Sequence, residues 1–120
     1  MNFLSMLIVI ILVPIIMIIC GWVLFKNTPK KINRLFGYRT KRSMKNIDTW
    51  IFAQKHYGKI SIIIGMVLLI LSIFISILFR NNSSDVIEIA SLIIILLQII
   101  VLIVSLIPTE LTLKNRVELK

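Results

Sequence analysis

Few side chains in this sequence could serve as catalytic acids, bases, nucleophiles or metal ligands. His56 is the only histidine and Cys20 the only cysteine. Acid and base catalysis needs titratable groups held together, and a protein metal site needs several ligands of these types. Asp85 and Glu88 are the one carboxylate pair at helical spacing, and the favourable dipole at a helix N-terminus explains two acids there. We therefore expect neither enzyme activity nor a cofactor.

Two other kinds of chemistry fit the sequence poorly. Proton-coupled transport needs an ionisable group inside a membrane span, and Glu88, at the end of an apolar block, is the nearest candidate. A lipoprotein would be acylated at its cysteine, but Cys20 has no small residue directly before it and no basic segment precedes its apolar block. We expect Cys20 to be a small apolar residue near a helix end.

The elements that hold these residues are three long apolar blocks. The 120-residue chain is 58% hydrophobic, with a mean hydropathy of +1.01. Residues 3–25, 60–79 and 86–107 each come close to the roughly 20 residues that a helix needs to cross a hydrocarbon core. Backbone amides in lipid must be paired within their own helix or a closed barrel. The sequence therefore predicts one all-α integral membrane domain, residues 1–120, with three transmembrane helices and a retained first span.

Basic residues between the spans predict the orientation. The segment 26–59 contains ten Lys and Arg residues against one acid, Asp48. Basic residues near span ends are retained in the cytoplasm, and they divide thirteen to one in favour of loop 26–59 plus tail 108–120. We expect a multi-pass plasma membrane protein with its N-terminus outside and its C-terminus inside. The same effect accounts for the net charge of +9, so nucleic acid is not an expected partner.

Part of the basic loop has the pattern of a helix. Asn46 can cap a helix that begins at Ile47, with Trp50, Gln54 and Tyr57 on one face. Gly58 can end this helix or ease its join to the second span. A basic segment of this kind, carrying Trp, is typical of a helix lying in the membrane interface against anionic headgroups. We expect a separate cytoplasmic amphipathic helix between the first and second spans.

Small and polar residues inside the spans predict how the helices meet. Pro14 should kink the first span or leave a carbonyl for a neighbouring helix to satisfy. The third span carries Gln98 near its middle, where an unpaired amide is costly, so we expect it to face the second span near Ser72. The second span has a stripe of small residues that we expect to pack on the third span: Ser61, Gly65, Ser72 and Ser76.

One string in the basic loop carries a family resemblance. It runs Asn33-Arg34-Leu35-Phe36-Gly37-Tyr38-Arg39-Thr40, and Trp50, Ala53, Gln54, Lys55 and Gly58 follow it. With a span before it and two after it, the chain resembles the SdpI family of bacterial membrane proteins, in particular their terminal three-span module. One departure is Lys41, where many relatives have proline. The candidate binding or motif residues are Asn33, Phe36, Gly37, Tyr38, Arg39, Thr40, Trp50, Gln54 and Gly58.

The resemblance implies immunity against a secreted, hydrophobic killing peptide that attacks the membrane. The expected partners are therefore anionic lipid headgroups and an apolar toxin peptide, which would be met within the bilayer. A receptor that sequesters a transcriptional repressor in the cytoplasm and a holin-like or structural membrane protein remain alternatives. Homo-oligomerisation also stays open. The string itself can equally well fold the loop onto the inner leaflet, since Gly37 permits a turn and Arg39 can bind phosphate.

Overall fold

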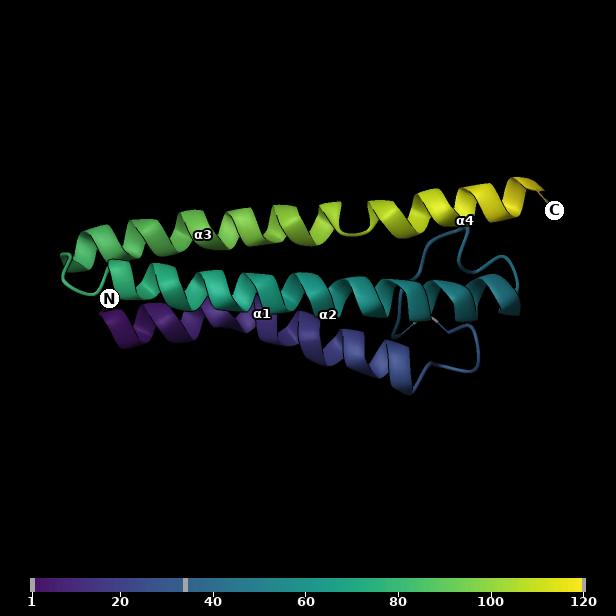
Figure 1. Cartoon of the computed structure of the whole chain (residues 1–120), viewed down its shortest axis with the longest axis horizontal. Helices are drawn as coiled ribbons and strands as arrows, with labels where there is room; N and C mark the ends of the chain where they lie inside the picture. The colour runs from purple at the N-terminus through teal and green to yellow at the C-terminus, as the bar shows by residue number, and fades with distance from the viewer. Residues whose placement is uncertain (1, 34, 120) are drawn as a thin grey trace.

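A computed structural model describes residues 2–33 and 35–119, so Arg34 and Lys120, counted above among the basic residues, lie outside it. The described chain forms four helices, α1 (Phe3–Lys26), α2 (Ile47–Leu78), α3 (Ser84–Val104) and α4 (Ile107–Leu119). In Figure 1, α1, α2 and α3 run along the long axis and α4 continues the line of α3. Three helical segments, the third being α3 with α4, are long and apolar enough to cross a membrane. The predicted all-α fold with three spans is confirmed.

The molecule is longer than a bilayer is thick. Its long axis measures 56 Å, against a hydrocarbon core of roughly 30 Å. Arg80 and Asp85 flank the short turn between α2 and α3 and set one boundary there. Near the other end of the spans, the Lys26 and Lys59 ammonium groups lie 5.1 Å and 5.4 Å from the ring of Phe25, an arrangement that suits the headgroup level. The first turns of α2, together with α4, therefore project beyond the hydrocarbon at the basic end.

The predicted separate amphipathic helix is wrong, although Asn46 caps a helix as expected. Asn46 and Thr49 form a reciprocal capping box, and α2 then continues without a break to Leu78. Gly58 does not end this helix but lies inside it, where the amphipathic segment joins the second span. The apolar face of the first turns is covered by protein instead of lipid, because Trp50 and Gln54 are fully buried. An amphipathic pattern shows that one face of a helix must be buried, but not whether protein or lipid buries it.

Glycines bring α1 and α2 into close contact. A Cβ built on Gly58 would lie 2.7 Å from the carbonyl oxygen of Gly21, and a Cβ on Gly21 would lie 2.7 Å from that of Gly58. The Ser61 hydroxyl donates to the carbonyl of Met17 at 2.7 Å. Gly65 faces Pro14 and Ile18 of α1. This half of the small-residue stripe therefore packs on α1, and not on the third span as expected, because backbones approach closely only where both helices lack bulk.

The other half of the stripe lies beside α3, where Gln98 connects all three spans. Its Nε2 donates to the Ser72 hydroxyl at 2.9 Å and to the carbonyl of Ile10 at 2.8 Å. Ile10 lies four residues before Pro14, which has no N–H to donate to that carbonyl. Gln98 thus satisfies the carbonyl that Pro14 leaves free in α1. Ser76 is buried too, and its hydroxyl bonds the Ser72 carbonyl of its own helix.

The third span is interrupted at the basic end. α3 ends at Val104 and α4 begins at Ile107, so the segment expected to be a tail from residue 108 is helical. Pro108 lacks the N–H that would bond the carbonyl of Val104, which explains the break. The Ser105 hydroxyl lies 3.0 Å from the Tyr57 hydroxyl, which ties the break to α2.

Candidate functional site

The motif loop, residues 33–40 with all but Arg34 described, is held against the first turns of α2. The Gln54 side chain pairs with the backbone of Tyr38 in both directions. Its Oε1 accepts from the Tyr38 N–H at 2.6 Å, and its Nε2 donates to the Tyr38 carbonyl at 2.8 Å. Gln54 is fully buried, so water does not compete for these two bonds. One side-chain amide therefore pairs with both backbone groups of Tyr38, as a residue of a neighbouring β-strand would.

The loop takes this path because of the residues that precede Tyr38. The Asn33 Oδ1 accepts from the backbone N–H groups of Leu35 and Phe36, at 3.1 Å and 2.9 Å, which closes a turn. Gly37 has a φ of +117°, a backbone conformation that residues with a Cβ rarely adopt. A Cβ there would also lie 2.7 Å from the Gln54 Oε1. The glycine is therefore required both by backbone conformation and by the close approach of Gln54.

The segment after the motif fastens its other end. The Ser43 hydroxyl accepts from the Thr40 N–H at 2.8 Å, and the Ser43 N–H bonds the Thr40 hydroxyl at 3.2 Å. Thr49 in the capping box of α2 then donates to the Ser43 carbonyl at 3.1 Å. The loop and the start of α2 thus share one hydrogen-bonded network. Thr40 has a structural role in it.

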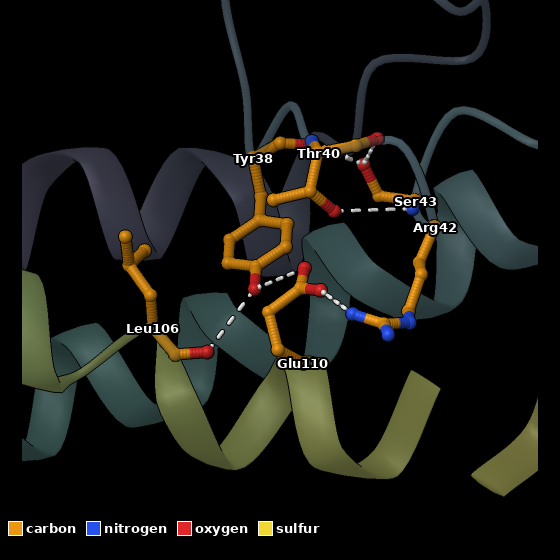
Figure 2. A network of polar contacts seen from close by, with 6 residues as sticks. All are labelled: Tyr38, Thr40, Arg42, Ser43, Leu106 and Glu110. Carbon is orange, nitrogen blue, oxygen red and sulfur yellow. Dashed lines mark hydrogen bonds and ion pairs between the residues drawn. The ribbon is translucent and has the colours of Figure 1, made fainter. Parts of the chain in front are cut away.

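Tyr38 connects the loop to the break between α3 and α4, as Figure 2 shows. Its hydroxyl bonds the Glu110 Oε1 at 2.7 Å and the carbonyl of Leu106 at 3.1 Å. The other carboxylate oxygen of Glu110 receives the Arg42 guanidinium at 3.1 Å. Burial, followed by the hydrogen bond to Glu110 and its charge, raises the pKa of Tyr38 far above its ordinary value. The hydroxyl therefore stays protonated and remains a donor at physiological pH.

Trp50 and Arg39 have opposite surroundings. Trp50 is fully buried, packs beneath Gly37 and donates its indole N–H to the Pro29 carbonyl at 2.8 Å. It supports the loop from below. Arg39 is exposed, and within the part of the chain that the structure describes, no hydrogen bond or ion pair holds its guanidinium. Phe36 is also 41% exposed. Among the described residues of the motif loop, Tyr38 alone is buried, whereas Leu35, Phe36 and Arg39 are exposed.

An apolar groove of about 550 Å³ lies beneath the motif loop. Met17 and Cys20 of α1 line one wall, Leu102 and Leu106 line the other, and Tyr57 of α2 lies at its base. The motif loop closes it at the basic end, where Arg39 and Thr40 contribute to the lining. The groove therefore leads from an exposed cation into the membrane-spanning part of the molecule.

The predicted residues form two groups. The motif residues, together with Trp50 and Gln54, come together at the basic end, while Ser72, Ser76 and Gln98 lie deeper in the spans. Gly58 and Gly65 lie between the two groups, at the contact of α1 with α2.

Sequence reasoning missed Glu110, Arg42 and Ser43. The one usable signal was the position of Glu110 two residues after Pro108, because a helix restarted there must lie near the basic loop. The pairing of Glu110 with Tyr38 spans 72 residues, and no local pattern indicates it.

Comparisons with known proteins give a family. A model of the SdpI/YfhL protein family matches residues 30–109. An uncharacterized protein, YfhL of Bacillus subtilis strain 168, is 38% identical over 53 residues, which cover 44% of this chain and 48% of that relative. The match thus spans about half the length of the relative. No solved structure matches significantly.

Proposed function

Because this chain belongs to the SdpI/YfhL protein family, we propose that it is a membrane immunity protein protecting the cell against a secreted hydrophobic killing peptide. The observation that carries the proposal is the construction of the motif loop. Its backbone is fixed by Gln54 and its underside by Trp50, yet Arg39 is left exposed and unpaired among the described residues. A loop that served only as a connector would not need this network. The arrangement supports a role for the outward residues in protection.

The protein is proposed to lie in the plasma membrane with its N-terminus outside and the motif loop in the cytoplasm. The charge distribution supports this orientation, since loop 26–59 and the C-terminal segment hold thirteen of the fourteen basic residues. The turn between α2 and α3 would then be the main exposed feature outside. It is only a few residues long, whereas a stable protein interface takes roughly 20 to 30 residues from each partner.

The peptide would therefore be met within the bilayer. α1 offers a long lipid-facing surface in which Leu4, Ile8, Leu12 and Ile16 are each more than half exposed. Moving an apolar peptide from lipid to such a surface changes its hydrophobic free energy little. The strength of the contact is therefore set by side-chain packing between the helices. The motif loop would position α1 against α2 and α4 from the inner side.

Survival assays at matched membrane levels test the proposal. Cells that express the protein should tolerate the cognate peptide, and Arg39→Ala should weaken protection without changing insertion, because the Arg39 guanidinium makes no hydrogen bond or ion pair with the described residues. Lys41→Ala is the matched control, since Lys41 is exposed in the same basic loop and does not line the groove. Trp50→Ala should weaken protection through loss of the loop support. Full protection by the double variant Arg39→Ala, Trp50→Ala would show that the motif loop has no role in protection.

Two other functions give different results in the same cells. A holin-like protein should kill the cells that express it, with no peptide added. A receptor that sequesters a repressor is favoured by the part of α2 and α4 that projects beyond the hydrocarbon, which offers a surface to a soluble partner. That function predicts that transcription responds to the peptide. The Arg39→Ala variant should then lose this transcriptional response while cell survival stays unchanged.

A further inference from the structure

The groove beneath the motif loop has the dimensions of a site for a thin apolar chain. Its lining on α1 extends from Val13 to Leu24, a length of about 16 Å at the helical rise per residue. The groove holds about 550 Å³, and away from the motif loop its lining is apolar except for Tyr57 and Ser61.

The polar groups around the groove are already engaged. The Ser61 hydroxyl donates to the Met17 carbonyl, the Tyr57 hydroxyl is paired with Ser105, and the Tyr38 hydroxyl is bonded to Glu110. An extended peptide would bring backbone N–H and C=O groups into this apolar space without partners, at a cost of several kcal/mol for each group. A hydrocarbon chain has no such groups. The chemistry of the lining therefore selects an acyl chain over an extended peptide backbone.

Charge identifies the other end of the ligand. Arg39 contributes to the lining where the motif loop closes the groove, and its guanidinium is unpaired among the described residues. Lys26 and Lys59 mark the headgroup level near the same end. An arginine can bind a phosphate through two parallel hydrogen bonds. We propose that the groove binds one acyl chain of an anionic phospholipid, with the lipid phosphate at Arg39.

This site is independent of immunity, since a lipid could occupy it whatever the cellular role. It implies that the motif loop closes over a lipid from its own membrane leaflet. The bound chain would then fill the space between α1 and the end of α3, where protein side chains leave the groove open.

Photo-crosslinking with a phospholipid that carries a photoreactive group in its acyl chain tests the site. The full-length protein is placed in nanodiscs containing photoreactive phosphatidylglycerol or, in parallel, phosphatidylcholine with the same chains. We expect crosslinks on the peptides that carry Cys20 and Leu102, about fivefold stronger with phosphatidylglycerol, as one basic contact at a membrane surface gives. Arg39→Gln should bring the anionic lipid down to the level of the neutral one, and Lys41→Gln should not.

Filling the groove gives an independent test. Cys20→Trp and Leu102→Trp should each abolish crosslinking in the groove, whereas Ile19→Trp, at an exposed position outside the lining, should leave it intact. Circular dichroism establishes that each variant is folded. Equal labelling by the two lipids in the unmodified protein, or unchanged labelling in both groove-filled variants, would overturn the proposal. Native mass spectrometry from bacterial membranes should show one retained anionic phospholipid, and a retained peptide or second copy in its place would equally overturn it.

Discussion

Gln98 and Pro14 should be energetically coupled, although they lie on different helices. Gln98→Leu removes two donated hydrogen bonds, to Ser72 and to the carbonyl of Ile10. Such bonds in membrane proteins average about 0.6 kcal/mol and reach about 1.7 kcal/mol. The substitution also removes the Gln98 Oε1, the one buried side-chain polar atom without a partner in the described part of the chain, which offsets some of the loss. We expect a net destabilisation of about 1 kcal/mol.

Pro14→Ala should reduce that cost. An alanine at this position has an N–H that can donate to the carbonyl of Ile10 within α1, so the carbonyl no longer depends on Gln98. In the Pro14→Ala background, Gln98→Leu should then be close to neutral, which gives a coupling energy of about 0.5–1 kcal/mol. The free energies of unfolding of the four proteins, measured by titration with a denaturing detergent in mixed micelles, provide this cycle.

Ser76→Ala is the matched control for the cycle. Ser76 is buried too, but among the described residues its hydroxyl bonds only the Ser72 carbonyl of its own helix. Its effect should add to that of Pro14→Ala within about 0.3–0.5 kcal/mol. Additive effects of Gln98→Leu and Pro14→Ala would show that Gln98 does not compensate for the missing N–H.

Three further predictions concern the helix contact, the motif loop and the orientation. Gly58→Ala should force α1 and α2 apart, because the new Cβ would lie 2.7 Å from the Gly21 carbonyl oxygen, and detergent unfolding should show a loss of about 1–3 kcal/mol; an unchanged stability would contradict the close contact. Tyr38→Phe should cost about 1–3 kcal/mol by leaving the partly buried Glu110 with one partner fewer, and should speed hydrogen exchange in α4; unchanged exchange would show that Tyr38 does not hold α4. A cysteine at position 83 in a Cys20→Ser background should react with an impermeant reagent in intact cells, since the turn is predicted to lie outside, and labelling only after permeabilisation would reverse the orientation.

Some features of the fold follow from local sequence and therefore needed no tertiary information. Three apolar blocks of about 20 residues have one stable solution in lipid, and that solution is a helix for each block. The cap at Asn46 is also local, because a capping box joins residues only three apart. Pro14 predicts a free carbonyl at Ile10 for the same reason, because its missing N–H would have bonded that residue four positions earlier.

Tertiary structure alone decided which surface covers which. The face of Trp50 and Gln54 has the same sequence pattern whether lipid or protein covers it, and the structure shows that the cover is the loop preceding α2, through Pro29 and Tyr38. The stripe containing Ser61 and Gly65 likewise fits any helix with small residues, and Gly21 made α1 the partner. Sequence patterns determine helices because helix hydrogen bonds are local, whereas partners depend on packing between distant segments, which no local pattern records.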